Sequence, residues 1–240
     1  MGRSRVKGIA VGVADLRHKP KFRSERISQL IYGEEVRILG SEEDYYRAVG
    51  RDRYEGYVQK SLVGDLDGDR AYKMAERHRA GGLQLPFGSY LSEGEAKRLK
   101  VPRKLLVPVD RGADPTSLAG DFLGVPYLWG GTSDFGYDCS GFTQRLFRYS
   151  CIELPRNAGW QRDAGEAVNG FEAARRGDLV FFTGHVAVYL GAKKIVHANL
   201  SHGGVSITDL ADGSGYSKRL LGILQGIRRF EGADFTGGRA

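Results

Sequence analysis

Cysteine is scarce in this chain of 240 residues, which contains only Cys139 and Cys151. The two are 12 positions apart, a spacing that matches neither a zinc-binding nor a CxxC redox pattern. We therefore expect no structural disulfide and no metal site built from cysteines.

Long hydrophobic runs are also absent. No apolar segment approaches the roughly 20 residues that a membrane-spanning helix needs. The start, MGRSRVKGIAVGVADL, is basic, but its apolar stretch is broken by glycine and soon meets Asp15 and Arg17, unlike a signal peptide. Val6 stands where a myristoylation pattern requires Ser or Thr. We expect a cytoplasmic protein with no membrane partner.

The charge is unbalanced, with a formal net charge of +7 and a pI of about 9.4. A basic protein can bind nucleic acid, an anionic surface or a carboxylate-rich substrate. Lys and Arg are spread among many acids, however, and no basic run is interleaved with aromatics as a nucleic-acid groove would require. We expect no nucleic-acid partner.

The length exceeds that of a typical domain of about 100 to 150 residues and predicts two domains. The hydrophobic fraction of 41% and the charged fraction of 27% are ordinary for a globular protein with a buried core.

Short strands separated by glycine turns are predicted from Ile9 to Val63. Alternation of polar and apolar residues at 35–38 and 46–49 is the period-2 pattern of half-buried strands. We predict a small all-β barrel at 1–65. For 66–111 the sequence allows a helix stop or a hairpin around Gly81-Gly82, and we favour a β-rich connector.

An α+β domain is predicted at 112–232. Asp114 and Pro115 are typical of the cap and first position of a helix, and a second helix is expected to begin near Cys139, with Phe142, Leu146 and Tyr149 on one face. Strand-like segments follow: DLVFFT, HVAVYLG, KKIVHAN, VSITDL and LLGILQGIRRF. Helices followed by strands indicate an antiparallel sheet.

Cys139 is the candidate nucleophile because it is placed at a helix N-terminus. Backbone amides and the helix dipole there favour thiolate over thiol and can lower the pKa below its free value of about 8.5. The alternative for a lone cysteine is a small buried residue in a tight turn.

Two histidines in consecutive predicted strands support the functional interpretation. His185 and His197 lie 12 residues apart, on strands joined by the turn LGAKK, so both imidazoles can face one side of an antiparallel pair. His185 would act as general base and His197 would hold its tautomer. Hydrogen-bonded strand histidines, or a zinc site with a further ligand, are the alternatives. His18, His78 and His202 receive no role.

The segment 114–230 resembles the NlpC-type family of cell-wall cysteine endopeptidases. PYLWGG, DCSG, RRGDLVFF, GHVAVY and IVHA carry the resemblance in that order. It implies a papain-like fold, with Cys139 as nucleophile, His185 as base and His197 as orienting residue.

The same resemblance implies that Tyr127 stabilises the oxyanion, and that Asp138 and Ser140 contact the amine and the D-glutamate carboxylate of the substrate. The alternatives are an aromatic anchor beside Trp129 and helix capping. Ala158 stands where relatives often carry serine, which puts a substrate contact there in doubt. Arg156 could supply charge near this position, although a surface arginine is the commoner explanation, and we expect Asp178 to be structural.

The N-terminal barrel resembles a bacterial SH3-like domain through LRHKP, QLIYGEEV, DYYRAV and YEGYV. The resemblance implies recognition of a free N-terminal L-alanine by an acid and a tyrosine. Glu25 and Tyr57 are the candidates and Glu55 and Tyr54 the alternates, although exposed glutamates and strand tyrosines are also common without such a role.

These inferences together predict a cysteine endopeptidase that hydrolyses the γ-D-glutamyl–diamino acid bond of murein peptides beginning with free L-alanine, in cell-wall recycling. The expected partner is the tripeptide L-Ala-γ-D-Glu-diamino acid or the corresponding tetrapeptide, and no cofactor or metal is expected. An amidase or acyltransferase of the same fold, or a non-catalytic wall-binding protein, is the alternative. The sequence does not determine the oligomeric state.

Overall fold

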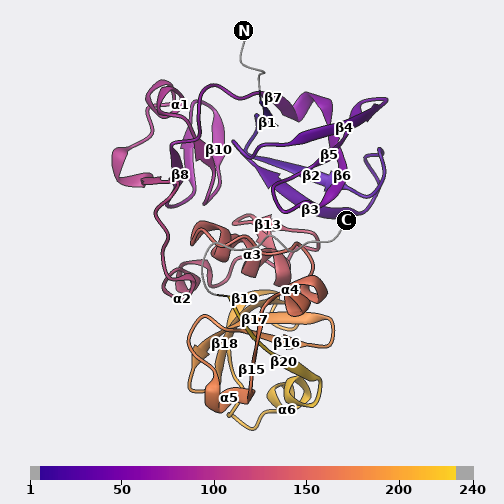
Figure 1. The fold of residues 1–240 in the computed structure, drawn as a ribbon, viewed down its shortest axis with the longest axis vertical. Helices are drawn as coiled ribbons and strands as arrows, with labels where there is room; N and C mark the ends of the chain where they lie inside the picture. Colours follow the sequence, from indigo (N-terminus) through magenta and orange to yellow (C-terminus); the bar gives the residue numbers. More distant parts are fainter. Residues whose placement is uncertain (1–5, 231–240) are drawn as a thin grey trace. The chain divides into compact units, whose positions relative to one another are not determined.

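The computed structural model describes residues 6–230, so the last two residues of the predicted peptidase domain, 231 and 232, lie outside the described part. The chain forms two units, coloured by sequence in Figure 1: residues 1–111 with 129–134, and residues 112–128 with 135–240.

The first unit begins with a barrel-like arrangement of antiparallel strands. The central sheet has the order β3-β2-β6-β5-β4, while β1 pairs with β7. The elements are β1 (Lys7–Ile9), β2 (Val13–Arg17), β3 (Arg26–Ile31), β4 (Arg37–Glu42), β5 (Tyr45–Val49), β6 (Glu55–Gln59), the 3-10 turn η1 (Lys60–Leu62) and β7 (Val63–Asp65). The predicted all-β character is confirmed. The core of this barrel is apolar and consists of Ile9, Ala14, Leu16, Leu30, Val36, Ala48 and Val58.

The connector is rich in strands, as expected. Its elements are β8 (Tyr72–Met74), β9 (His78–Ala80), β10 (Leu83–Leu85), β11 (Tyr90–Leu91), α1 (Glu93–Arg98), η2 (Arg103–Leu105) and β12 (Leu106–Pro108). Strands β9 and β10 form a hairpin around Gly81 and Gly82, whose φ angles of 55° and 80° suit glycine at a tight turn. Tyr32 of the barrel packs into the core of the connector, which explains why the two form one unit.

The second unit contains a six-stranded antiparallel sheet of order β15-β20-β16-β17-β18-β19. Its elements are α2 (Pro115–Leu118), η3 (Ala119–Phe122), β14 (Gly136–Tyr137), α3 (Cys139–Tyr149), α4 (Ala158–Ala164), β15 (Glu166–Val168), α5 (Gly170–Ala173), β16 (Leu179–Phe182), β17 (His185–Gly191), β18 (Lys194–Asn199), β19 (Gly204–Asp209), α6 (Gly215–Gly222) and β20 (Leu224–Arg229). The predicted α+β class with an antiparallel sheet is confirmed.

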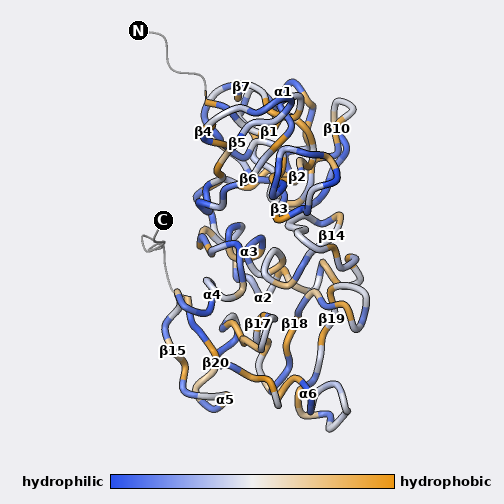
Figure 2. The backbone as a smooth tube through the Cα atoms, turned by 90° about the vertical axis from the view of Figure 1, so that its right-hand side faces the viewer, coloured by the Kyte–Doolittle hydropathy of each residue, from blue (hydrophilic) through white to orange (hydrophobic). Residues whose placement is uncertain are grey.

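Helix α3 packs against β17 and β18, whereas α5 and α6 lie at the far side of the sheet in Figures 1 and 2. Hydrophobic stretches run along β17 and β18 in Figure 2. Val180, Ala187 and Ile195 belong to one core cluster with Leu220 of α6. The sheet is therefore held between helices that cover it on both sides.

The start of α2 follows the sequence closely. Asp114 caps the helix by accepting a hydrogen bond from the Thr116 amide at 2.8 Å, and Pro115 occupies the first position. The segment LLGILQGIRRF differs from the prediction. Its Leu220 and Leu221 lie in the last turn of helix α6, which ends at Gly222, and the strand is limited to Leu224–Arg229. Ser214 caps α6 through the Ser217 amide at 3.1 Å, a start signal that the strand interpretation overlooked.

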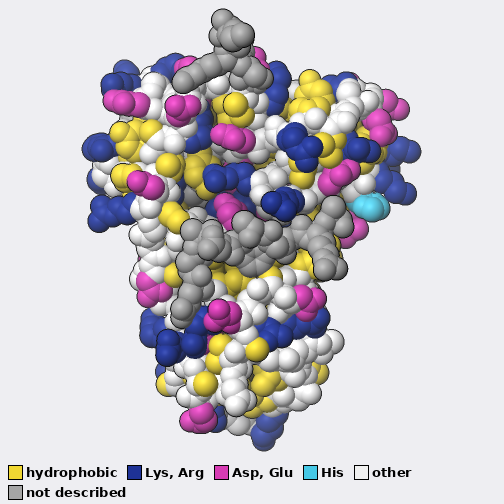
Figure 3. Space-filling view, in the orientation of Figure 1, with side chains coloured by type: hydrophobic (Ala, Val, Ile, Leu, Met, Phe, Trp, Pro, Cys, Tyr) yellow, Lys and Arg dark blue, Asp and Glu magenta, His cyan; other side chains and the backbone are white. Residues whose placement is uncertain are grey.

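None of the helices in residues 6–230 is both long and apolar enough to cross a membrane. Charged side chains of both signs are interspersed on the face shown in Figure 3. That distribution agrees with the mixed charge pattern along the sequence.

Candidate active site

Cys139 is the first residue of helix α3, as the sequence predicts. Asp138 caps the helix, and its Oδ1 accepts a hydrogen bond from the Gly141 amide at 2.7 Å. Ten of the eleven residues of α3 are buried, including Phe142, Leu146 and Tyr149. Cys139 is therefore carried on a helix that is fixed by packing on nearly every side.

The electrostatic environment of Cys139 differs from the prediction. Burial and, to a smaller extent, the negative charge of Asp138 raise the pKa of the Cys139 thiol to about 11, although hydrogen bonds from the Val186 and Ser140 amides and the charge of Arg156 lower it. The helix start alone does not produce a thiolate, because desolvation outweighs it. The expectation of a lowered pKa is wrong, and the resting residue is a thiol that keeps some accessible surface.

His185 and His197 meet as the strand pattern predicts. His185 begins β17, His197 lies in the middle of β18, and His185 Nε2 is 2.7 Å from His197 Nδ1. The two rings are nearly edge to face, with centroids 4.9 Å apart. Cys139 lies against the amide of Val186, which directly follows His185 in β17. The Cys139 thiol therefore lies beside the start of β17, where His185 contacts His197 of the neighbouring strand β18.

Burial keeps both imidazoles neutral. Desolvation lowers the pKa of His185 to about 4, and desolvation together with the charges of His185 and His202 lowers that of His197 to about 3. At neutral pH the site consists of a thiol and two uncharged imidazoles. His185 is then able to accept the thiol proton as the nucleophile attacks, because a neutral imidazole is a base.

Tyr127 is held on both sides by backbone hydrogen bonds. Its amide donates to Gly203 O at 2.9 Å, and the neighbouring Pro126 O accepts from the Tyr137 amide at 3.1 Å. The backbone at Val125 and Pro126 approaches that of Gly204 so closely that a side chain at 204 would collide with the Val125 carbonyl oxygen, so this position requires glycine. Burial, Cys139 and Asp138 raise the pKa of the Tyr127 phenol to about 12, so the phenol keeps its proton and can donate a hydrogen bond.

Arg156 is not a surface residue, contrary to the prediction. Its side chain is 2% exposed and both of its terminal nitrogens pair with the Asp138 carboxylate, at 3.0 Å for Nη1 to Oδ1. Nη1 also donates to Ser140 Oγ at 3.0 Å. Asp138 and Ser140 thus form a charged network with Arg156 on either side of the nucleophile, and the capping role of Asp138 is confirmed.

The sequence favours a surface position for Arg156 because a lone Arg is usually exposed, and burial supports the alternative that it supplies charge beside Cys139. The feature that could have indicated its burial is its position in LPRNAG, between Leu154, which is buried, and the start of helix α4. Ala158 begins that helix, α4, where its methyl offers no hydrogen bond to a substrate.

The barrel candidates have separate partners. Glu25 Oε1 accepts a hydrogen bond from Trp129 Nε1 at 2.8 Å within the first unit. Tyr57 donates to Glu42 Oε1 at 2.9 Å, which raises the pKa of its phenol. Of the alternates, Glu55 pairs with Arg47 at 3.2 Å and Tyr54 packs at the edge of the barrel core. These contacts do not bring Glu25 and Tyr57 together.

Asp178 has the structural role expected of it. Its carboxylate accepts a hydrogen bond from the Arg175 amide at 2.7 Å and forms an ion pair with Arg229 at 2.8 Å. These contacts connect the start of β16 to the end of β20. Within residues 6–230, no three His, Cys, Asp or Glu side chains are grouped so as to hold a metal ion.

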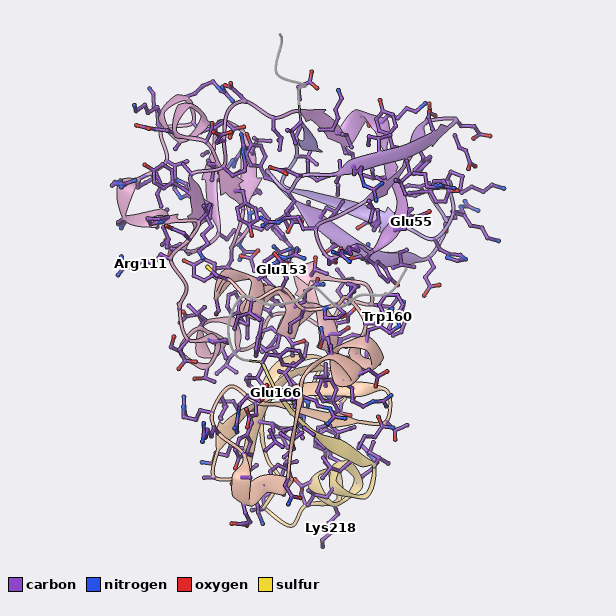
Figure 4. All side chains as sticks on the ribbon, viewed as in Figure 1. Glu55, Arg111, Glu153, Trp160, Glu166 and Lys218 are labelled. Carbon is purple, nitrogen blue, oxygen red and sulfur yellow. The ribbon has the colours of Figure 1, made fainter. Side chains whose placement is uncertain are left out.

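Figure 4 labels Glu153 and Trp160, which lie on either side of Arg156 in the sequence. Glu153, after α3, pairs with the buried Arg148 at 2.9 Å. Trp160 on α4 is exposed, in contrast to the buried side chains of α3. The segment from α3 to α4 therefore has a packed inner side and an open outer side.

Comparison with known proteins agrees with this geometry. Residues 124–225 match the NlpC/P60 family, and residues 16–62 match the bacterial dipeptidyl-peptidase Sh3 domain. A solved NlpC/P60 family protein from Bacillus cereus superposes with a TM-score of 0.73 at 20% identity, covering 93% of this chain and 98% of that one. This likeness confirms the papain-like fold with an SH3-like N-terminal domain.

Two curated relatives extend the comparison. The gamma-D-glutamyl-L-lysine dipeptidyl-peptidase of Bacillus cereus is 38% identical over 112 residues, which are 43% of this chain and 33% of that protein. Dipeptidyl-peptidase 6 of Lysinibacillus sphaericus is 26% identical over 252 residues, covering 82% of this chain and 89% of its own length. The first match spans only about one third of its relative. The fold agrees with these matches, and the chain carries an NlpC/P60 domain that follows a bacterial Sh3 domain.

Proposed function

We propose that this protein is a cysteine endopeptidase that hydrolyses the γ-D-glutamyl–diamino acid bond of murein peptides. The observation that carries the proposal is one spatial arrangement. Cys139 starts helix α3, its thiol lies beside the Val186 amide, and His185, the residue before Val186, is 2.7 Å from His197. The name of the Bacillus cereus relative supports the choice of bond.

The proposed reaction begins when Cys139 Sγ attacks the γ-carbonyl carbon of D-glutamate. His185 accepts the thiol proton through Nδ1, since its Nε2 faces His197. Charge develops on the carbonyl oxygen, to which the protonated Tyr127 phenol donates. The tetrahedral intermediate then expels the amine of the diamino acid, which takes the proton from His185, and leaves a thioester on Cys139.

Hydrolysis of the thioester completes the cycle. His185, neutral again, removes a proton from water as the water oxygen attacks the same carbonyl carbon, and returns that proton to the departing sulfur. The products are L-Ala-γ-D-Glu and the free diamino acid. Each step needs a neutral imidazole at the start, which the low pKa of His185 provides at neutral pH.

We further propose that the Sh3 domain makes the enzyme selective for a free N-terminal L-alanine, with Glu25 as the acid that pairs with the ammonium group. Glu25 is the stronger candidate because its carboxylate is exposed, with a hydrogen bond from Trp129. Tyr57 is the weaker candidate because its phenol already donates a hydrogen bond to Glu42. We also propose that Ser140 takes part in substrate binding, with Asp138 holding the local network. A cytoplasmic site of action in wall recycling stays a prediction, which fractionation of cells would test.

The test is mass spectrometry of the products from a panel of murein peptides. We expect L-Ala-γ-D-Glu and free diamino acid from the tripeptide, and cleavage at least tenfold slower for its N-acetyl form, since losing a charge-assisted hydrogen bond of about 1.5–3 kcal/mol has that effect. Release of ammonia or transfer of the acyl group to another amine would instead identify an amidase or acyltransferase. Binding of peptides without any product would favour a non-catalytic wall-binding protein.

A further inference from the structure

The two histidines continue into a third buried polar side chain that the proposed reaction has not yet used. His197 Nε2 lies 3.0 Å from Thr208 Oγ1, while His197 Nδ1 faces His185 Nε2 at 2.7 Å. His197 is fully buried and Thr208 is nearly so. Both nitrogens of His197 therefore have a protein partner.

The sheet register explains why these three side chains meet. Ile195 of β18 is directly opposite Thr208 of β19, so Thr208 is the diagonal neighbour of His197 on the same face. Val188 of β17 is opposite Val196, and continuing this register makes His185 the diagonal neighbour of His197 on the other side. Long side chains reach across such diagonals, which produces one row over three adjacent strands.

A row with two neutral imidazoles has only two proton arrangements, because each neutral ring carries one N–H. In the first, His185 Nε2–H donates to His197 Nδ1, and His197 Nε2–H donates to Thr208 Oγ1. In the second, Thr208 donates to His197 Nε2 and His197 Nδ1–H donates to His185 Nε2. The second arrangement places the proton of His185 on Nδ1, the atom that must accept the thiol proton.

Only the first arrangement is compatible with catalysis. Once His185 has taken the thiol proton, it carries hydrogen on both nitrogens, so His197 Nδ1 must accept and His197 Nε2 must carry the other proton. That N–H is buried and its partner is the Thr208 hydroxyl. A donor left without an acceptor at this stage would disfavour the charged intermediate relative to the resting enzyme.

The other groups around His197 have different contacts. His202, in the turn after β18, interacts with Asn199 through Nδ1 at 3.0 Å, and Tyr216 of α6 faces the His197 ring at a centroid distance of 6.3 Å. The hydroxyl of Ser206, opposite His197 in the register, accepts a hydrogen bond from Asn199 Nδ2 at 2.9 Å. Thr208 is thus the neighbour whose hydroxyl meets His197 Nε2.

We propose that Thr208 is a positioning residue that accepts a hydrogen bond from His197 Nε2–H and so sets the tautomers of both histidines, leaving His185 Nδ1 free as the base. This inference rests on the proposed cysteine peptidase function and adds a fourth member to its Cys139–His185–His197 row.

The kinetic test compares Thr208→Val with Thr208→Ser on the murein tripeptide. Valine keeps the shape of threonine but has no acceptor, and we expect kcat to fall roughly tenfold to a hundredfold with little change in KM, the range implied by one buried unsatisfied donor. Serine keeps the hydroxyl, and we expect it to retain most of the activity. Thermal unfolding of both variants shows whether the fold is preserved.

A tautomer measurement keeps this proposal separate from the function on which it depends. In the full chain with ¹⁵N-labelled histidine, protonated and bare ring nitrogens resonate far apart, and we expect both His185 and His197 to carry their proton on Nε2 in the resting protein. Thr208→Val should shift His197 toward the Nδ1–H form. If the wild-type protein shows these tautomers but cleaves no murein peptide, that result would overturn only the proposed function.

The proposal about Thr208 itself has two ways to fail. A wild-type His185 protonated on Nδ1 would overturn it, even if Thr208→Val does not fold. Full kcat in a folded Thr208→Val variant of an active enzyme would overturn it as well, as would equal losses in the Val and Ser variants.

Discussion

The barrel of the first unit and the surroundings of α3 in the second unit differ in how many charged side chains they bury. The barrel core is formed by apolar side chains from Ile9 to Val58, and Glu34 is the charged side chain that the described part of the barrel buries, together with the polar Ser28 and Gln29. Around α3 the protein buries the Arg156–Asp138 pair and His197 as well as apolar groups. Burying charged or polar groups is costly unless each is partnered, and here each has precise partners.

This contrast shows which part of the chain is shaped by chemistry. The apolar barrel core is explained by stability alone, because burial of each such side chain contributes about 1.5–3 kcal/mol. The charged pair and the histidine row do not maximise stability, and hydrophobic residues of similar size would often serve stability as well or better. Their retention beside a nucleophile is accounted for by function. The following experiments test this distinction.

The largest effect is expected at the nucleophile. Cys139→Ala should abolish turnover and leave the unfolding temperature nearly unchanged, because the residue supplies the attacking sulfur and little packing. Cys151→Ala, at an exposed position, is the matched control and should retain activity. Substantial hydrolysis by the Cys139 variant, or inhibition by chelators in place of thiol alkylators, would contradict the cysteine mechanism.

The second effect concerns the orienting histidine. His197→Ala should lower kcat by about two to four orders of magnitude, as expected when the residue that fixes the tautomer of a catalytic imidazole is lost. Steady-state kinetics with the tripeptide measure this, with His18→Ala on the exposed barrel surface as control. Stoichiometric zinc in the purified protein would count against this role and favour a metal site.

The third effect tests the buried ion pair. Arg156→Met leaves the Asp138 carboxylate buried without its counter-charge, and we expect a loss of about 3–5 kcal/mol in the free energy of unfolding. It should also slow alkylation of Cys139, because Arg156 lowers the thiol pKa. Urea unfolding and the rate of reaction with iodoacetamide are the measurements.

Arg162→Met is the control for that variant. Arg162 on α4 pairs with its exposed neighbour Asp163 at 3.0 Å, and its loss should change stability by no more than about 0.5 kcal/mol. Similar losses in the two variants would mean that burial of the Arg156 pair has no special importance.

The fourth effect is a pH dependence of stability. The pKa of His185 and His197 in the folded protein, about 4 and about 3, lies below the ordinary value of 6.5, so the unfolded chain binds protons first. The stability that these neutral histidines contribute is fully present above pH 6.5 and is lost progressively as the pH falls from 6.5 toward the folded pKa values of about 4 and about 3. The loss should amount to several kcal/mol.

Unfolding temperatures of the wild type and His197→Asn between pH 7 and pH 4 check this prediction. Asparagine does not titrate, so the variant should lose less stability than the wild type on acidification. Equal pH slopes would show that His197 is not kept neutral by burial.

The smallest effect is expected in the barrel. Glu25→Gln should lower kcat/KM about tenfold for the tripeptide with a free amine and have little effect on its N-acetyl form, because one charge-assisted hydrogen bond is lost. Tyr57→Phe removes a hydroxyl engaged with Glu42 and should change the rate less. Equal rates for free and acetylated peptides in the wild type would mean that the barrel does not recognise the amine.

Local sequence signals determined much of the fold and of the site. Alternation of polar and apolar residues predicted the barrel strands. Gly81-Gly82 indicated a hairpin, and Asp114-Pro115 indicated the start of a helix. The strand spacing of His185 and His197 predicted that the two rings meet, because period-2 geometry and an antiparallel turn suffice to place them on one face. Such features depend on neighbours along the chain.

Other properties depend on groups that only folding brings together. The burial of Arg156 against Asp138, 18 residues away, turned an expected surface residue into part of the site. Burial also reversed the expected pKa shift of Cys139, since desolvation is set by the whole surrounding domain and not by the helix start. Local patterns along the chain specify which residue types stand in which strands and helices. The packing of the whole domain sets how strongly each side chain is desolvated, and the register of β18 and β19 brings His197 to Thr208.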